Sequence, residues 1–408
     1  MDFSHALKLE SDKSFGAEYK NALLKKSLLM HLAVNGDETI AELAKELNIS
    51  VPTVTKLVAD LKDDGLLEDN GKIETAGGRR PNVYGLSGNA FYFLGADIRR
   101  RRIELVLLNF KGGIISRKEE IHFVLEDTME AFDCVCQEIQ LFIEECGIPK
   151  DKIAGLGVSM IGRIDAREGN SYTFFNFNEI SLAQLLEQRI GISTYIENDS
   201  RAMMYAEKTF GVIRDEKNVL FLNLGRGVGA GIMLDGKIYY GKTGFAGEFG
   251  HIPIFDNEII CHCGKKGCLE TEVSGIALEK MFAEHLKNGE NSVLYDKWMA
   301  GQEILLYDII EVANNDDMLA ISLIEEMAAK LGRGVGILIN LLNPDLVVLG
   351  GSLALTGDYL MLPMKASVNK YSLSLVSRDT RFKLSALGEN ASAIGVAVLL
   401  RDKMLGIV

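Results

Sequence analysis

The residues best suited to chemistry lie between positions 251 and 270. A histidine precedes three closely spaced cysteines, and these four residues are His251, Cys261, Cys263 and Cys268. Three thiols and one imidazole are a donor set that zinc holds tetrahedrally in structural sites, and the glycines between the cysteines let the backbone wrap around a small ion. Buried thiols that gather without a metal are the alternative, but this spacing favours one structural zinc ion per chain.

Two glutamates flank this cluster. Glu248 lies just before His251, and Glu270 lies just after Cys268. A metal held by the neighbouring residues would fix the positions of both carboxylates. The pattern therefore predicts that the metal shapes a binding site. An ordinary surface carboxylate is the alternative for Glu248.

Composition limits the kind of protein this is. The chain has 408 residues, 47% of them hydrophobic, which predicts two or three domains with substantial cores. No segment resembles a signal peptide or reaches membrane-spanning length, so we expect a cytoplasmic protein without membrane contact. Cys134, Cys136 and Cys146 follow an amphipathic helical pattern and are expected to be reduced. The formal net charge of −13 means that any contact with DNA must come from a local basic surface.

Residues 1–88 have the pattern of a winged helix-turn-helix domain. The expected elements are helices at 20–35, 39–47 and 51–64 and strands at 66–73 and 81–86. Thr39 and Glu42 form a predicted capping box at the start of the second helix. Three helices with a short turn before the third, followed by a two-stranded hairpin, define this domain.

The third helix of such a domain enters the major groove of DNA, so its outward residues are candidate contacts. These residues and two arginines on the wing are Ser50, Thr53, Thr55, Lys56, Arg79 and Arg80. The wing arginines suit a narrow minor groove, where the potential is most negative. Asp60, Asp63 and Asp64 on the same helix favour the alternative, a protein-interaction or dimerisation module. Helix order, turn and basic wing together predict double-stranded DNA as the partner.

From residue 89 to residue 408, short apolar runs alternate with helical stretches, which is typical of α/β folds. The pattern predicts a first lobe at about 89–200, completed by the C-terminal helix, and a second lobe at about 201–390. The strands expected in the first lobe, and those that repeat them in the second, lie at 91–98, 103–109, 113–123, 153–159 and 194–196, and at 219–224, 229–234, 237–240 and 346–349. Two such lobes around a cleft are the architecture of the actin and hexokinase-like ATPases.

Four segments carry a resemblance to a known family. They are Glu197-Asn198-Asp199, residues 244–251, the cysteine run up to Glu270, and residues 342–351. Together they resemble the ROK family of sugar kinases and repressors over about residues 91–400. The winged helix is similar to that of the family's repressor branch, which includes the N-acetylglucosamine and xylose repressors.

The resemblance implies where a sugar would bind. The implied sugar-site residues are Asn198, Asp199, Glu248, His251 and Glu270. Carboxylates accept hydrogen bonds from sugar hydroxyls, and His251 would hold the metal through one ring nitrogen while offering the other to a hydroxyl. In kinases of the family, the aspartate that matches Asp199 is the general base. A helix N-cap is the alternative role for Asp199.

The phosphate-binding elements depart from the family pattern. Kinases of the family carry Asp-x-Gly-Gly-Thr after the first strand, whereas this chain has Asp97 followed by Ile98 and the run Arg99–Arg102. Long side chains cannot reproduce a glycine turn that closes on phosphate. Arg226 replaces the hydroxyl residue of the second loop, and Ile161 replaces a proline. We therefore expect no enzymatic activity. The arginines either bind the phosphate of a sugar phosphate or form a solvated hairpin tip.

These features predict a sugar-responsive transcriptional regulator, a repressor of carbohydrate genes that keeps a kinase fold as its sensor. Sensing needs the ligand pocket but not phosphoryl transfer. The expected partners are a DNA operator and a sugar or sugar phosphate effector, and we expect a homodimer or homotetramer. The alternatives are an ATP-dependent hexose kinase with an appended DNA-binding domain and a protein that uses the winged helix to bind another protein.

Overall fold

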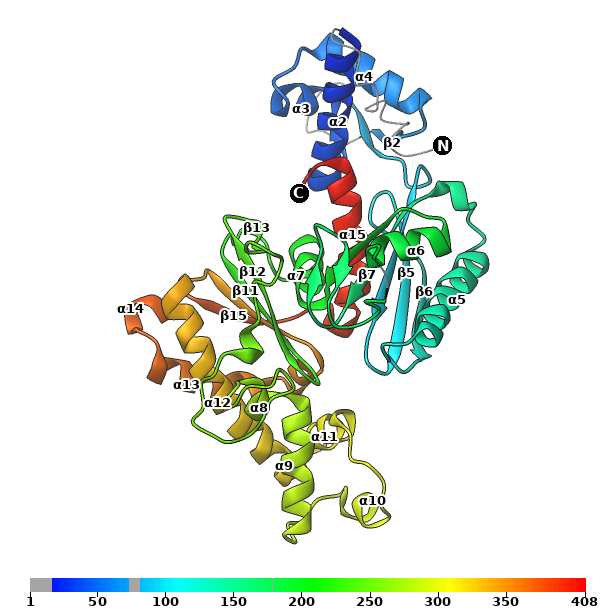
Figure 1. Ribbon diagram of the computed structural model, residues 1–408. Coiled ribbons are helices and arrows are strands. Elements are labelled where there is room, and N and C mark those ends of the chain that lie inside the picture. Colours follow the sequence, from blue (N-terminus) through cyan, green and yellow to red (C-terminus); the bar gives the residue numbers. More distant parts are fainter. Residues whose placement is uncertain (1–16, 73–80, 178) are drawn as a thin grey trace. The chain divides into compact units, whose positions relative to one another are not determined.

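The computed structural model describes residues 17–72, 81–177 and 179–408 (Figure 1). The chain forms two units, one running up to Glu197 and including Val396–Val408, the other comprising Asn198–Gly395. Each unit contains a five-stranded sheet, which confirms the predicted α/β class. Among the described residues, no helix combines the length and the apolar character needed to cross a bilayer.

The N-terminal part of the first unit is a winged helix-turn-helix domain, as predicted. Its elements are α2 (Ala17–Asn35), β1 (Glu38–Thr39), α3 (Ile40–Glu46), α4 (Val51–Asp63), β2 (Leu67–Lys72) and β3 (Asn82–Leu86). The strands form a sheet of order β1-β3-β2. Leu57, Val58 and Leu61 of α4 are buried and lie at the spacing of one helix face. Arg79 and Arg80 lie outside the described residues.

Local side-chain chemistry determines where these helices begin and end. The backbone N–H of Thr39 donates to Glu42 Oε2 at 2.8 Å, and the N–H of Glu42 donates to Thr39 Oγ1 at 3.3 Å, so the predicted capping box is present. Pro52 lies in the first turn of α4, where a missing N–H costs no hydrogen bond. Gly65, with a φ of 72°, follows the end of α4.

The remainder of the first unit is built on a sheet of order β10-β7-β4-β5-β6. Its strands and helices are β4 (Tyr92–Ile98), β5 (Arg102–Asn109), β6 (Ile114–His122), β7 (Ile153–Met160), β10 (Thr194–Asn198), α5 (Met129–Cys146) and α6 (Leu182–Ile190). The short strands β8 (Ile164–Asp165) and β9 (Asn170–Ser171) pair separately. Cys136 of α5 is buried in the core, Cys134 and Cys146 are half-buried, and all three thiols are free, as expected.

The sheet of the second unit repeats this arrangement in the order β13-β12-β11-β14-β15. Its strands are β11 (Val219–Leu224), β12 (Val228–Leu234), β13 (Lys237–Ile238), β14 (Leu346–Gly350) and β15 (Arg381–Leu384). In both sheets the first strand of the set pairs antiparallel with the second and parallel with the fourth. The predicted recurrence of one layout is therefore confirmed.

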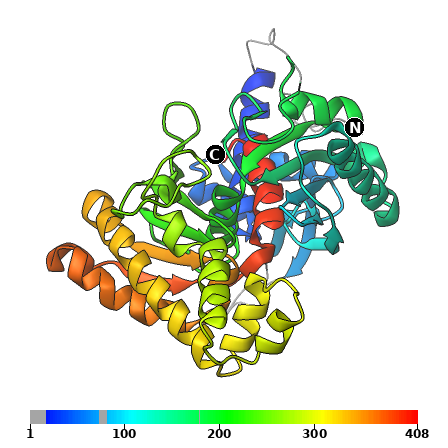
Figure 2. The ribbon, with the colours of Figure 1, turned by 60° about the horizontal axis from the view of Figure 1, so that its bottom comes forward.

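Helices pack against the second sheet. They are α7 (Asp199–Thr209), α8 (Glu270–Val273), α9 (Gly275–Lys287), α10 (Tyr295–Met299), α11 (Leu306–Ala313), α12 (Met318–Leu342), α13 (Asp358–Tyr371), α14 (Ser374–Ser377) and the start of α15 (Ala391–Leu405). The long helices α12 and α13 lie side by side (Figure 2). Leu331 and Val335 of α12 and Val347 of β14 belong to one buried cluster, which is the core of this unit.

Candidate metal centre and ligand site

The four predicted metal ligands lie together in the second unit. His251 Nδ1 is 3.6 Å from Cys261 Sγ, and Cys263 Sγ is 3.6 Å from Cys268 Sγ. All four ligand atoms lie within 4.8 Å of one another. Tetrahedral zinc, with bonds of about 2.3 Å to sulfur and about 2.0 Å to nitrogen, separates its ligand atoms by about 3.5–3.8 Å. The donor set and its spacing therefore fit one zinc ion.

The backbone around these ligands turns tightly. The N–H of Cys261 donates to Lys265 O at 2.8 Å, and the N–H of Gly264 donates to Cys261 O at 2.8 Å. Gly267 has a φ of 75°, and a Cβ at this position would lie 2.1 Å from Phe255 O. Only glycine fits there, so the glycine next to Cys268 is required for the cysteines to face one another.

The thiols differ in how readily they lose a proton. Burial raises the pKa of Cys261, and it raises the pKa of Cys268 to about 12. At Cys263, burial is outweighed by the backbone N–H of Lys265 and by the neighbouring thiols, so the pKa of Cys263 is lowered. Because metals bind the thiolate, loading must release protons from this cluster.

Glu270 is held at both of its carboxylate oxygens. The backbone N–H of Val228 donates to Glu270 Oε2 at 3.0 Å, and His262 Nδ1 lies 3.0 Å from Glu270 Oε1. The His262 ring meets the His251 ring edge-on at 5.0 Å between centroids. Sequence reasoning assigned no role to His262.

Glu248 and His251 lie in one short turn, the 3₁₀ helix Phe249–His251 and the residue before it. His251 Nε2 is 3.8 Å from Glu248 Oε2. With Nδ1 directed at the cysteines, the other ring nitrogen thus faces the carboxylate. Gly247, with a φ of 96°, allows this turn, because a Cβ there would lie 2.2 Å from Ala230 O.

Asn198 and Asp199 begin α7. Asn198 Oδ1 accepts from the N–H of Ser200 at 3.1 Å and from the N–H of Arg201 at 3.4 Å, so Asn198 is the N-cap of the helix. The capping role considered for Asp199 therefore belongs to Asn198. Asp199 Oδ2 instead accepts from Asn223 Nδ2 at 2.9 Å.

The strands β11 and β12 connect this helix start to the metal cluster. Asn223, which holds Asp199, is paired with Gly229 in the β11–β12 ladder. The residue before Gly229 is Val228, whose N–H holds Glu270. Adjacent residues of β12 thus link the carboxylates of Asp199 and Glu270, although 70 residues separate them in the chain.

The run Arg99–Arg102 forms the tip of the hairpin between β4 and β5. The N–H of Arg99 donates to Arg102 O at 2.9 Å. The side chain of Arg99 turns inward, with Nε 2.5 Å from Oδ2 of the fully buried Asp97 and one terminal nitrogen 3.8 Å from Glu104. Burial, reinforced by the charge of Asp97, raises the pKa of Glu104 despite Arg99 and Arg117.

Arg226, in the loop between β11 and β12, also has an internal partner. Its guanidinium donates to Glu279 Oε1 at 3.0 Å, and the same oxygen accepts from the N–H of Leu306 at 2.8 Å. Glu279 belongs to α9 and Leu306 begins α11. Arg226 thus joins the loop between β11 and β12 to two helices of the same unit.

The candidate DNA-binding surface lies on α4. Ser50, Thr55 and Lys56 are exposed and Thr53 is half-buried. Ser50 Oγ lies 2.7 Å from Thr53 Oγ1, and the hydroxyl of Thr55 donates to Val51 O at 2.8 Å.

The acidic residues on α4 are partly neutralised within the domain. Lys25 Nζ lies 2.9 Å from Asp64 and 3.8 Å from Asp60. This pairing reduces the negative charge that favoured a protein-interaction module.

Fold and site together define an α/β protein with an N-terminal winged helix and a cysteine–histidine cluster that could hold a metal ion beside several carboxylates. A sequence profile of the ROK family matches residues 93–403, and one of the MarR family matches residues 23–73. The chain belongs to the ROK family.

Two relatives of known name cover most of the chain, and a third covers about three quarters of it. The xylose repressor of Caldicellulosiruptor bescii is 27% identical over 366 residues, which cover 89% of this chain and 92% of that protein. A crystal structure of a ROK family transcriptional regulator, a homologue of the E. coli MLC protein, superposes with a TM-score of 0.77 at 25% identity and covers 94% of this chain and 98% of that one. A ROK glucokinase from Streptomyces griseus, solved with glucose and AMPPNP, has a TM-score of 0.66 at 25% identity and covers 76% of this chain and 98% of that one.

Proposed function

We propose that this chain is a DNA-binding repressor of carbohydrate genes whose operator affinity falls when a sugar or sugar phosphate binds beside a structural zinc ion. The observation that carries the proposal is the presence in one chain of a winged helix-turn-helix and of a metal cluster flanked by Glu248 and Glu270. The similar proteins named as repressors support the same combination.

The sugar would bind in the second unit, near Asn198, Asp199, Glu248, His251 and Glu270. Zinc, held by His251 and the three cysteines, would supply rigidity, because a ligand site is most selective when its groups cannot move. Effector binding changes DNA affinity only by its differential affinity for two states of the protein, commonly about 1–3 kcal/mol. Two copies of the chain would place their winged helices on half-sites about 34–36 Å apart.

Operator selection tests the proposal. The full-length protein is incubated with a random pool of DNA duplexes, with and without a panel of sugars and sugar phosphates. We expect enrichment of one palindromic site and its release by a single effector. Absence of enrichment in every condition would contradict the proposal.

The internal partners of the loop arginines support a sensor over a kinase. Arg99 places a cation against Asp97, and Arg226 is held by Glu279. Each guanidinium lies on a loop that, in family kinases, closes on nucleotide phosphates, and displacing it would break an ion pair. Because Arg99 and Arg226 already have carboxylate partners, neither guanidinium is needed to bind the phosphate of a sugar phosphate.

The alternative function is an ATP-dependent hexose kinase. The structural similarity to a ROK glucokinase is the observation that favours it. We expect no sugar-dependent formation of ADP above background, either in the native protein or in Asp199→Asn. A coupled assay with several hexoses measures this. Turnover in the native protein that Asp199→Asn abolishes would establish the kinase instead.

His262 provides a further test of the ligand site. Replacing His262 with alanine removes its 3.0 Å contact with Glu270 Oε1, and we expect effector affinity to fall about fivefold, because that carboxylate oxygen loses its side-chain partner. Zinc content should not change. His285→Ala is the matched control, since His285 forms a similar exposed pair with Glu290 at 2.5 Å. Titration of the effector identified by operator selection measures both. Equal losses in the two variants would contradict a positioning role for His262.

A further inference from the structure

A cavity lies at the outer edge of the second sheet, and none of the cysteine–histidine cluster lines it. It has a volume of about 470 Å³, and its lining includes Lys365, Arg378, Arg381, Phe382 and Lys383. These residues come from α13, β15 and the segment that joins α14 to β15. The volume is within the range of about 300–1,000 Å³ that is typical of small-molecule sites.

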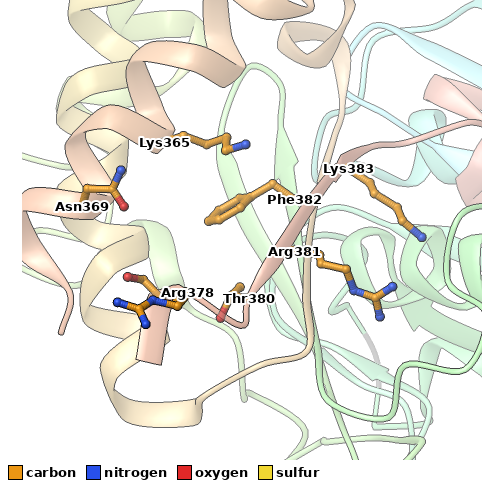
Figure 3. Close-up of a pocket in the computed structure, with 8 residues that line it drawn as sticks. Lys365, Asn369, Arg378, Thr380, Arg381, Phe382 and Lys383 are labelled. Atoms are coloured by element: carbon orange, nitrogen blue, oxygen red, sulfur yellow. The ribbon is translucent and has the colours of Figure 1, made fainter. Parts of the chain in front are cut away.

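The cavity carries more positive charge than its surroundings neutralise. Arg381 and Lys383 share one carboxylate, Glu216, at 3.1 and 3.2 Å. Lys365 Nζ lies 5.7 Å from the centroid of the Phe382 ring, and neither Lys365 nor Arg378 has an ion-pair partner among the residues that the structure describes. Glu216 therefore neutralises cations on one side of β15, whereas Lys365 and Arg378 on the other side keep their charge (Figure 3), in a chain whose formal net charge is −13.

Glu216 holds two of these cations in position. Its side chain is only 2% exposed. Burial alone would raise the pKa of Glu216, but backbone N–H donors and Lys383 outweigh it, so the pKa is lowered and the carboxylate stays ionised. Lys383 Nζ also donates to Val212 O at 2.8 Å. Lys383 is thus held at two points, whereas Arg381 has the ion pair with Glu216 and a side chain that is 62% exposed.

The strand itself adds a donor. β15 is the last strand of its sheet, and the N–H groups of Arg381 and Ser385 donate to Asp345 O and Leu349 O on the β14 side. Because N–H groups alternate in direction along a strand, the N–H of Phe382 points away from β14. Figure 3 shows Arg381 and Lys383 on one side of this strand, and Phe382 on the side of Lys365 and Asn369.

We propose that this basic cavity binds a small phosphate ester. Lysine, arginine and a backbone N–H at an open edge are the donors that hold phosphate oxygens. The Phe382 ring offers apolar surface for the organic part of such a ligand. The cavity shares no residue with the ligand site beside the cysteine–histidine cluster, so substitutions can test the two sites separately. The alternative is that the charges only prevent other strands from pairing with this edge.

Calorimetric titration of the zinc-loaded, full-length protein tests the proposal with three probes: inorganic phosphate, glucose 6-phosphate and AMP. We expect one molecule per chain to bind for at least one ester. Inorganic phosphate that binds as tightly would show that the phosphate group alone is recognised, whereas tighter binding of one ester identifies the organic part. Each titration is repeated with Glu270→Gln, which disables the metal-side site, and the binding should persist.

Variants locate the binding. Lys365→Ala and Arg378→Ala should each weaken it about fivefold, and the double variant should abolish it. Both side chains are exposed, so the variants are expected to fold, which circular dichroism checks. Lys370→Ala, an exposed lysine of α13 outside the cavity, is the control for loss of charge. No heat with any probe, or unchanged affinity in the double variant, would overturn the proposal. Neither result bears on the repressor function, because binding is measured without DNA.

Discussion

Replacing Cys268 with serine is expected to release the metal and to abolish the response to sugar. Cys268 is fully buried, and its sulfur lies 3.6 Å from Cys263 Sγ. A serine hydroxyl is not a thiolate, so the remaining three ligands cannot complete a tetrahedral site. The loop that carries His251 and Glu270 would then lose its anchor, and effector affinity should fall at least about tenfold, which corresponds to about 1.4 kcal/mol.

Two measurements check this result. Elemental analysis should find one zinc per native chain and almost none in Cys268→Ser, and the effector should no longer release the variant from its operator. Cys134→Ser, a half-buried thiol of α5 far outside the cluster in sequence, is the control and should change neither value. A Cys268→Ser protein that lacks zinc but responds fully to sugar would remove the metal from the mechanism.

Features that depend on neighbouring residues could be predicted from the sequence. The capping box of Thr39 and Glu42 needs only a spacing of three residues. Buried positions on α4 follow from helical periodicity, because one face of a helix must meet the core. The three cysteines lie within eight residues of one another. Their spacing and donor type were therefore enough to predict that they gather with His251, as they do in the structure.

Other features depend on residues that are far apart in the chain. The edge strand β15 has only two apolar residues, Phe382 and Leu384, alternating with cations, which is too short a pattern to separate from a loop. The two-residue strand β1 has no pattern at all.

The partners of the charged side chains could not be predicted either, because they too lie far apart in the chain. Arg226 meets Glu279, and Lys25 meets Asp64, across tens of residues. Sequence reasoning could identify Arg99 as foreign to a phosphate loop, but only the fold brings its guanidinium onto Asp97. His262 lies between two of the cysteines, but its position alone did not indicate a role. Its contact with Glu270 depends on the turn around Gly264.

Replacing Lys56 is expected to have the largest effect on DNA binding. Lys56 is exposed on α4, the helix that enters the major groove in this fold, and no ion pair to it is found among the described residues. A lysine that contacts phosphate contributes about one unit to the slope of log affinity against log salt. Lys56→Ala should therefore weaken binding about tenfold on every sequence and lower the slope by about one, on the same principle.

Charge reversal and a matched control separate this contact from a general loss of charge. Lys56→Glu adds repulsion from the phosphates and should weaken binding more than Lys56→Ala. Lys280→Ala removes one exposed positive charge from α9 in the other unit and should leave both affinity and slope unchanged. Fluorescence anisotropy on the selected operator, from low to moderate salt, measures all four proteins. If Lys56→Ala behaves like Lys280→Ala, then α4 does not contact the phosphates at this position. The affinity for the operator would then have to come from other residues of the winged helix, and the exposed Ser50 and Thr55 would be the next to replace.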